Sequence, residues 1–437
     1  MKFNNTKVKS IIIERLFEIF NYKIEYPENE NVLIITGPNG FGKTQVLNIL
    51  YNLFNRQFIF FHKLVFNKIS IFLSGNYHIE IIKNKVKNKP ELIFAFFDGE
   101  KKIETFNYTA NIDNQLIKHI ARYLPVARIG EHKWIDHRTD RVLSIDELIN
   151  EYANQLPVEI SKGLLKIKNK KANEILNSIK VHLIKEQRLF KRVQNIERNY
   201  RHDKEQTVMI ETIQSYSDEL RGLISERIQQ SYIISQSLDS SYPNRLISER
   251  KKVSKDEYDK RFAELTIKQE KLTKNGLYET QQEVLGYSED DAKALLVYLN
   301  DLEKKLAVFD DLLEKLELFT NILNERRFTF KSINISREKG FYFKTINNKE
   351  LKLSELSSGE QHEVVLLYEL IFKTKPNILV LIDEPEISLH VTWQKEFLND
   401  LLKIVKIQNF QVLIATHSPS IINDRWDLVY NLEKEDL

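Results

Sequence analysis

Short segments of alternating or continuously apolar residues fill the first hundred positions of the chain, a pattern typical of β-strands. Residues 11–26 and 31–36 are rich in Ile, and the second segment is a continuous apolar run that suits a buried parallel strand. Residues 44–54 then have helical spacing. Three later segments, separated by polar turns, favour an antiparallel sheet: residues 64–73, 77–83 and 92–97.

The middle of the chain changes to the spacing of helices. From about residue 171 to 200 apolar residues recur close to heptad spacing, and residues 295–323 repeat Leu and Phe mostly in steps of four and three. The second series predicts one helix of roughly 50 Å, with Ser288 and Asp291 as its N-terminal cap. A plain helical subdomain and a short antiparallel coiled coil both fit this spacing. Turns are expected at residues 241–244 and 274–276.

The last part of the chain returns to strands that are interleaved with helices. Residues 377–382 and 411–415 are apolar and poor in charge, and residues 361–374 carry an apolar stripe of helical spacing. Buried strands that alternate with helices imply a parallel sheet, so we expect an α/β fold. Two alternating segments add strands at residues 327–335 and 340–346.

Composition narrows the class of protein only moderately. Of 437 residues, 65 are basic and 62 acidic, and the net charge of +3 argues against a surface covered by nucleic acid, although a local basic patch stays possible. The chain has no Cys, which excludes disulfides, thiolate zinc sites and cysteine nucleophiles. No secretion signal and no apolar run of bilayer-spanning length is recognised, so a cytoplasmic protein is expected.

A glycine-rich loop provides the strongest chemical signal. The apolar run 31–36 leads into GPNGFGKT, which fits the pattern G-x-x-x-x-G-K-[ST] and opens the predicted helix. Glycines let such a loop turn its backbone N–H groups toward phosphate oxygens. Lys43 is expected to reach the β- and γ-phosphates of ATP, and Thr44 to bind Mg²⁺. The other predicted ATP-binding residues of this loop are Gly37, Pro38, Asn39, Gly40 and Gly42.

Two carboxylates follow the apolar run 377–382, as the second half of a nucleotide site requires. Asp383 is expected to hold Mg²⁺, directly or through water, and Glu384 to polarise the attacking water as the catalytic group. Two acids after a strand more often cap a helix when they stand alone. Their presence in one chain with the phosphate loop favours the catalytic interpretation.

The segment LSSGEQ at residues 356–361 resembles the signature of the ABC ATPases, in the variant of the RecF, Rad50 and SMC branch. In that family the segment begins a helix and contacts the γ-phosphate of ATP held by the opposite subunit. A Ser hydroxyl and the amides of a helix N-terminus do form an anion site. The resemblance implies nucleotide contacts from Ser357, Ser358, Gly359 and Glu360, whereas simple helix capping is the alternative.

Further motifs extend the resemblance toward the OLD-like ATPases. The stretch DEPEISLH, followed by Trp393 and Gln394, resembles their D-loop region, and His417 follows residues 411–415 where this fold places a switch histidine that acts on the γ-phosphate. Residues 123–128 resemble a Pro-x-x-Arg element, in which Arg128 either acts near the nucleotide or is an ordinary surface residue. No Q-loop glutamine is recognised.

The resemblance implies an ABC ATPase head, with a mostly parallel P-loop sheet and an antiparallel β lobe. Residues 1–165 and 327–437 are expected to form its two halves, and residues 166–326 a helical or coiled-coil insertion between them. ATP and Mg²⁺ are the implied cofactors, and a homodimer or higher homo-oligomer the implied assembly.

Neither a TOPRIM-like acidic cluster nor an HNH-like histidine cluster is recognised, so an effector is expected to be a separate polypeptide. The combination is most similar to ATPase subunits of two-component antiphage systems of the PARIS, Septu and retron-associated kinds. The resemblance implies a scaffold that controls a TOPRIM or HNH nuclease or a toxin, with a phage protein or DNA as trigger.

Two other functions remain open. A RecF/Rad50-like repair ATPase that clamps DNA would use basic residues near 166–171 and 188–201, which are equally typical of solvated helix faces. An ATP-binding scaffold with very slow hydrolysis would have the same architecture.

Overall fold

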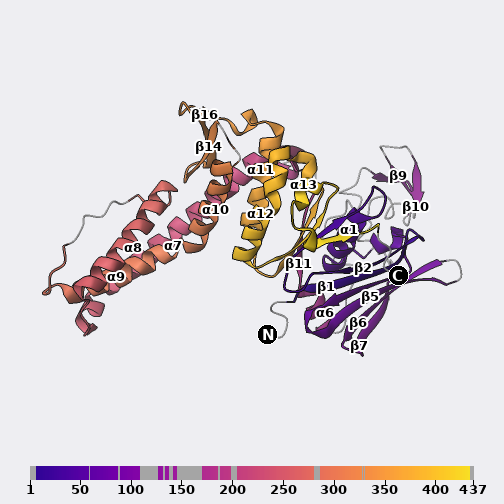
Figure 1. Ribbon diagram of the computed structural model, residues 1–437, viewed down its shortest axis with the longest axis horizontal. Helices are drawn as coiled ribbons and strands as arrows, with labels where there is room; N and C mark the ends of the chain where they lie inside the picture. The colour runs from indigo at the N-terminus through magenta and orange to yellow at the C-terminus, as the bar shows by residue number, and fades with distance from the viewer. Residues whose placement is uncertain are drawn as a thin grey trace. The chain divides into compact units, whose positions relative to one another are not determined.

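The computed structural model describes two compact units (Figure 1). One unit consists of residues 1–186 and 374–437, and the other of residues 187–373. The described residues are 6–58, 60–86, 89–108, 126–130, 133–136, 141–144, 170–185, 188–197, 204–279, 286–326, 328 and 330–433.

A five-stranded parallel sheet forms the centre of the first unit, in the order β11-β17-β18-β3-β19. The sheet assembles distant segments: β3 (Val32–Thr36), β11 (Lys180–Ile184), β17 (Ile378–Asp383), β18 (Gln411–Ala415) and β19 (Val429–Asn431). Strand β18 is buried at every position, which explains its continuous apolar sequence. Helix α1 (Lys43–Phe54) packs on β11, β17 and β18, and α12 (Val391–Gln408) connects β17 to β18.

A six-stranded antiparallel sheet completes the core of this unit, in the order β2-β1-β4-β5-β6-β7. Its strands are β1 (Val8–Leu16), β2 (Phe20–Glu25), β4 (Lys68–Leu73), β5 (Tyr77–Val86), β6 (Lys89–Asp98) and β7 (Lys101–Tyr108). Buried side chains of both sheets and of α1 form one hydrophobic cluster. A small sheet of β8 (Val126–Arg128), β9 (Lys133–Asp136) and β10 (Val142–Ser144) also belongs to this unit.

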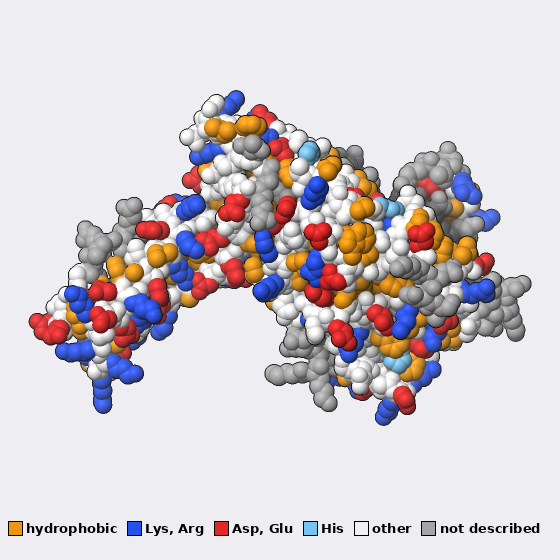
Figure 2. Space-filling model, in the orientation of Figure 1, with side chains coloured by type: hydrophobic (Ala, Val, Ile, Leu, Met, Phe, Trp, Pro, Cys, Tyr) orange, Lys and Arg blue, Asp and Glu red, His pale blue; other side chains and the backbone are white. Residues whose placement is uncertain are grey.

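Helices dominate the second unit: α7 (Thr212–Ser248), α8 (Lys255–Lys274), α9 (Ala292–Ala307) and α10 (Asp310–Arg326). Helix α9 packs against both α7 and α8, so the insertion is a helical subdomain rather than a two-helix coiled coil. Basic and acidic side chains are interspersed along these helices in Figure 2. The remaining elements are the hairpin β12 (Phe190–Glu197) and β13 (Lys204–Glu211), the sheet β14 (Lys331–Ser336), β15 (Gly340–Thr345) and β16 (Glu350–Leu351), and helix α11 (Ser358–Tyr368).

This arrangement confirms the predicted fold class, an ABC ATPase head with a mostly parallel P-loop sheet, an antiparallel β lobe and an inserted helical region. Within the described ranges, the helices are all too short or too polar to cross a bilayer.

Four local predictions were wrong. Residues 171–200 do not form one helix: among the residues of this range that the structure describes, only those of α6 (Lys170–Asn177) are helical, and β11 and β12 follow. The alternation Lys-Val-His-Leu-Ile lets β11 pair with the buried strand β17, and this pairing outweighs the local heptad spacing.

The long helix expected at residues 295–323 is divided into α9 and α10 by a break at residues 308–309. Its predicted cap is also different, because Asp291 occupies the N-cap position of α9 without a side-chain capping bond. The turn expected at residues 241–244 lies inside α7. Pro243 lies within this helix, and two residues later Arg245 donates to the Leu238 carbonyl at 2.6 Å and pairs with Asp301 of α9.

Candidate nucleotide-binding site

The glycine-rich loop connects the end of β3 to the beginning of α1. Gly42 is the N-cap of α1 and has a φ of 89°, in the left-handed region that favours glycine. A Cβ atom at Gly42 would also lie 2.8 Å from Leu16 Cδ2 at the end of β1. The loop therefore requires glycine here both for its backbone conformation and for its close contact with β1.

Aromatic residues of the β1–β2 hairpin contact the phosphate loop. The Tyr22 hydroxyl donates to the Phe41 carbonyl at 2.8 Å, and the ring centroids of Phe20 and Phe41 are 4.9 Å apart. Tyr22 is fully buried. Because the hairpin belongs to the antiparallel sheet, that sheet fixes the position of the phosphate loop.

Lys43 turns its ammonium group back toward the loop. Its Nζ donates to the carbonyls of Gly37 and Pro38, at 2.8 and 3.2 Å. Burial lowers the pKa of Lys43, and the carboxylates of Glu384, Asp383 and Glu386 oppose that shift. The loop thus holds a buried cation, which suits it to bind an anionic ligand.

Thr44 and Asp383 bring together two oxygen ligands of the kind that Mg²⁺ prefers. The Thr44 hydroxyl donates to Asp383 Oδ1 at 3.1 Å, and Asp383 is buried at the end of β17. In the described ranges no cluster of three or more His, Asp or Glu side chains could hold a metal ion alone. The pair fits a magnesium ion that obtains its remaining ligands from phosphate and water.

Glu384, His417 and Lys43 form a short chain of polar contacts. His417 Nε2 lies 3.1 Å from Glu384 Oε1, and His417 Nδ1 lies 3.3 Å from Lys43 Nζ. The ammonium can only donate, so Nδ1 accepts and Nε2 carries the hydrogen toward Glu384. Glu384 has a φ of 43°, an uncommon conformation for a non-glycine residue that often accompanies functional sites.

Glu386 organises the segment that carries His417, although sequence analysis did not assign it a role. Its Oε1 accepts hydrogen bonds from the Thr416 hydroxyl at 2.7 Å, from the His417 amide at 2.6 Å and from the Ser418 amide at 3.2 Å. Gln394 adds a second bridge, because its Oε1 accepts from the Ser418 hydroxyl at 3.0 Å. The third acid of the DEPE sequence at residues 383–386 was the only available signal.

The signature segment belongs to the second unit. Ser357 caps helix α11 in a capping box: its hydroxyl accepts from the Glu360 amide, while Glu360 Oε2 accepts from the Ser357 amide at 2.8 Å and from its hydroxyl at 2.9 Å. Lys331 of β14 donates to both carboxylate oxygens of Glu360, at 2.9 and 2.8 Å. The N-terminus of the helix is thus occupied by a carboxylate of the same chain.

The electrostatics of this helix end agree with that geometry. Burial opposes the ionisation of Glu360, but the bonds from Lys331 and Ser357 outweigh burial and hold its pKa below the usual value. Ser358 and Gly359 form the first turn of α11. An incoming phosphate would compete with Glu360 for the Ser357 hydroxyl.

The far end of α11 is tied to the first turns of α7. A π-helical turn, Glu369–Lys373, follows α11, and π-turns are frequent at functional sites. The Tyr216 hydroxyl of α7 donates to Glu369 Oε1 at 2.6 Å, and the Tyr216 and Tyr368 rings stack at 4.4 Å. Lys373 pairs with Glu219. A shift of the signature helix would therefore be transmitted to α7.

The remaining site residues expected from the sequence stay predictions or lie outside the described residues. Arg128 lies at the end of β8, where its Nε donates to the Gly130 carbonyl at 2.9 Å, and its role at the nucleotide stays a prediction. Residues 123–125, 166–169 and 198–201 of the predicted motifs lie outside the described residues.

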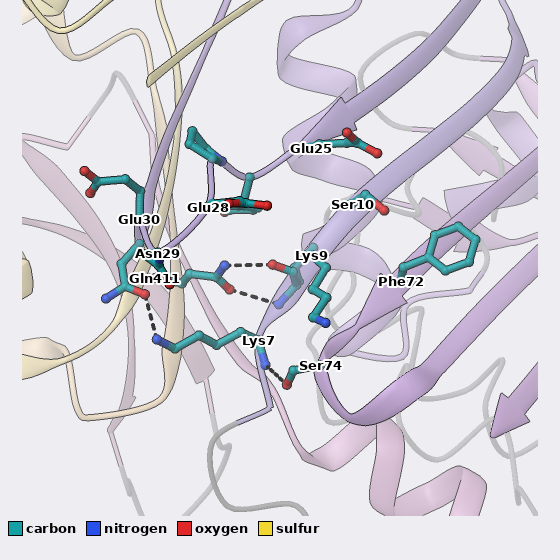
Figure 3. Close-up of a pocket in the computed structure, with 14 residues that line it drawn as sticks. Lys7, Lys9, Ser10, Glu25, Glu28, Asn29, Glu30, Phe72, Ser74 and Gln411 are labelled. Carbon is teal, nitrogen blue, oxygen red and sulfur yellow. Dashed lines mark hydrogen bonds between the residues drawn. The ribbon is translucent and has the colours of Figure 1, made fainter. Parts of the chain in front are cut away.

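A cavity of about 710 Å³ lies at the other end of the central sheet (Figure 3). Its lining includes Asn31 and Gln411, which stand at the amino ends of β3 and β18, whereas the phosphate loop and His417 follow the carboxyl ends of those strands. Gln411 exchanges two hydrogen bonds with the backbone of Val8, at 2.9 and 2.8 Å. This cavity is separate from the nucleotide residues, and Gln411 joins the two sheets there.

The fold and the cluster around Lys43 are those of a P-loop nucleotide-binding domain. A family model described as "AAA ATPase domain" matches residues 7–422, and the chain belongs to that family.

Curated relatives match only a short part of the chain. The lipoprotein-releasing system ATP-binding proteins LolD of Rickettsia bellii and Rickettsia prowazekii are 37% and 38% identical to it over 79 residues. Each match covers 18% of this chain and 34% of the relative, so the chain spans about a third of the length of these proteins.

The solved structures that resemble this chain include SMC head domains. The head from Pyrococcus furiosus, bound to the C-terminal domain of ScpA, is 12% identical, with 95% of this chain and 91% of that chain covered and a TM-score of 0.36. The head from Thermotoga maritima is 11% identical, with 97% and 94% covered and a TM-score of 0.33.

Proposed function

We propose that this protein binds ATP with Mg²⁺ and hydrolyses it to ADP and phosphate. The observation that carries the proposal is the convergence of Lys43, Thr44, Asp383, Glu384 and His417 at the carboxyl ends of three neighbouring parallel strands. Ligands of open parallel sheets bind at that edge. The chemistry of each group matches one part of a bound triphosphate.

The roles in hydrolysis follow from the positions of these groups. The loop amides and Lys43 hold the phosphates, and Thr44 with Asp383 would hold Mg²⁺, which neutralises charge on the phosphate oxygens. Glu384 orients the attacking water and accepts its proton. When ATP is bound, the Nε2 hydrogen of His417 that here faces Glu384 would donate to an oxygen of the γ-phosphate instead.

The assembly is a homodimer in which Ser357 and the first turn of α11 complete the ATP site of the other copy. The contributing groups are the Ser357 hydroxyl and the backbone amides of Ser358, Gly359 and Glu360, and an anion at a helix N-terminus is favourable. Bound ATP then joins two copies, and hydrolysis releases them.

The biological role is that of a cytoplasmic scaffold that holds a separate nuclease or toxin in a prokaryotic antiphage system and releases or activates it when infection is sensed. The resemblance of the DEPEISLH and LSSGEQ segments supports this role. The alternative is a RecF/Rad50-like ATPase that clamps DNA, and the long helical insertion favours it as a second candidate.

The mass of the protein under three conditions tests the assembly. The Glu384→Gln variant with ATP and Mg²⁺ should be found as a dimer or higher oligomer by light scattering, whereas the same variant with ADP, and the Lys43→Ala variant with ATP, should not. An equal mass in all three samples would rule out ATP-driven association.

A second experiment separates the two biological roles. Coexpression with neighbouring genes, followed by purification and mass measurement, should recover a complex with a nuclease or toxin. Turnover that is stimulated by duplex DNA and falls steeply with salt, without such a complex, would instead favour the DNA clamp.

A further inference from the structure

A second cavity, of about 690 Å³, lies at the far end of α1 from the phosphate loop. Its apolar floor includes Phe54, Leu176 and Ile179, and the amino end of β11 forms one side. The volume is in the usual range for ligand sites. Because α1 runs from Lys43 to Phe54, this cavity and the phosphate loop are at opposite ends of one helix.

The charged residues of this cavity are all basic. Arg56, Lys180 and His182 line it, and no Asp or Glu is among its lining residues. Half-buried Arg56 donates to Asn177 Oδ1 at 3.0 Å, and in the part of the chain that the structure describes neither Arg56 nor Lys180 forms a salt bridge with an acidic side chain. Burial lowers the pKa of Arg56. A partly desolvated guanidinium is stabilised by an anion, so the cavity is suited to a carboxylate.

The backbone beside these cations is the edge of the central sheet. Strand β11 pairs in parallel with β17 on one side, and no other described strand pairs with it. Sheet edges bind extended peptides by adding a strand, with pockets that receive alternate side chains. The cavity lies beside the open edge of β11 and is lined both by apolar residues and by the basic residues Arg56 and Lys180.

We propose that β11 and this cavity bind an extended acidic segment of a partner protein. The segment adds to the edge of β11, its apolar side chains enter the floor at Leu176 and Ile179, and its carboxylates pair with Arg56 and Lys180. A nucleic acid would satisfy the charges but neither the strand edge nor the apolar floor. The proposal names a contact for the separate effector, but it does not require ATP hydrolysis.

The test is a selection of random ten-residue peptides, displayed on phage, by the full-length protein. Wild-type protein should enrich peptides in which Asp or Glu alternates with apolar residues. A synthetic peptide of the enriched sequence should bind in fluorescence anisotropy, and Arg56→Glu or Lys180→Glu should weaken it by about tenfold or more. Amide hydrogen exchange in β11 should slow when the peptide is present.

Lys9→Glu is the matched control, because Lys9 is an exposed lysine at the other cavity and its reversal changes the net charge equally. It should leave peptide binding unchanged. Arg56→Gln replaces Arg56→Glu if the latter fails to fold. ATP turnover should persist in the Arg56 and Lys180 variants, so a failure of peptide binding is distinguishable from a failure of the nucleotide site.

The proposal is overturned if no peptide is enriched, if the enriched peptides lack acids, or if their binding ignores the Arg56 and Lys180 substitutions. Binding of a duplex oligonucleotide with the same dependence on Arg56 and Lys180, in place of any peptide, would also overturn it.

Discussion

The phosphate loop and the signature helix are the two proposed anion sites, and their side chains are prepared for a phosphate in opposite ways. In the first, Lys43 donates to two backbone carbonyls of its own loop, which are neutral acceptors that a phosphate can outcompete. In the second, the Ser357 hydroxyl donates to Glu360, a carboxylate that is itself paired with Lys331. The phosphate loop therefore offers the ammonium of Lys43 to a ligand, whereas the anion position of the signature helix is already occupied by the carboxylate of Glu360.

This difference suggests an order of events. Binding of ATP to the loop requires no charged group to leave, so each copy can bind nucleotide alone. Engagement of the signature helix by a γ-phosphate requires Ser357 to release Glu360. The second step is therefore expected to be the weaker and more readily controlled one.

Removal of the Lys43 ammonium should have the largest effect on ATP affinity. Lys43→Ala eliminates the charged donor of the loop, which is worth about 1.5–3 kcal/mol, and ATP affinity should fall roughly ten- to a hundredfold. Titration with a fluorescent ATP analogue measures it. Lys331→Ala is the control, since loss of a lysine from the signature side should leave binding to the single chain intact. An equal loss of ATP affinity in Lys43→Ala and Lys331→Ala would contradict the proposed difference between the phosphate loop and the signature helix.

Substitution of Glu384 should separate binding from chemistry. Glu384→Gln keeps the shape of the side chain but removes the group that accepts the proton of the water, so turnover should fall about a hundredfold or more. ATP affinity should be retained, because Lys43 and Thr44 are unchanged. Phosphate release and nucleotide titration provide the two measurements, and normal turnover would exclude Glu384 as the catalytic group.

Glu386 should affect turnover through the position of His417. Glu386→Ala removes the acceptor of three hydrogen bonds from residues 416–418 and should lower kcat about tenfold, with KM for ATP nearly unchanged. Glu386→Gln keeps one carbonyl acceptor and should recover part of the loss. A rise in KM without a change in kcat would show that Glu386 supports binding instead.

The signature side can be altered without removal of its helix cap. Glu360→Gln keeps an acceptor for the Ser357 amide but removes the competing charge, and it leaves Lys331 available for a phosphate. ATP-driven association should strengthen by about 1 kcal/mol, or roughly fivefold, whereas Ser357→Ala should weaken it. Analytical ultracentrifugation with ATP measures both. Weaker association of Glu360→Gln would mean that the carboxylate itself contacts the other copy.

The smallest effect concerns pH. Burial, together with the neighbouring Arg188, lowers the pKa of His362 on α11 to about 4. This imidazole is neutral in the folded protein but is protonated below about pH 6.5 in the unfolded chain, so stability should fall as pH decreases from 6.5 to 4. In the His362→Gln variant, the free energy of unfolding should decrease between pH 6.5 and pH 4 by on the order of 1 kcal/mol less than in the wild type. Urea titrations at several pH values measure it. An identical pH dependence in the variant would exclude His362 as its source.

Sequence patterns predicted correctly those elements in which the apolar positions of the sequence match the buried positions of the fold. The sequence of β18 suits only a buried strand. The glycine-rich sequence of residues 37–44 suits only a turn with several positive φ angles. Helix α1 and the antiparallel strands also appeared where alternation and spacing placed them.

The wrong or missing predictions share one cause. Contacts between residues far apart in the sequence decided between conformations that were equally acceptable locally. Leu176, Ile179 and Leu183 fit a heptad, yet Leu183 lies in β11 because β17 offers a strand partner. Glu386 was not assigned a role because its partners lie about thirty residues away in the chain, beyond any spacing rule.

The order of strands in the central sheet has a consequence for biosynthesis. Strand β3, which carries the phosphate loop, pairs only with β18 and β19 among the described strands, and these lie at residues 411–415 and 429–431. A nascent chain on the ribosome therefore exposes an unpaired strand with four consecutive apolar residues until nearly four hundred further residues have been translated. Nucleotide recognition should be among the last properties that the polypeptide acquires, and chaperones that cover β3 should be needed before ATP can bind.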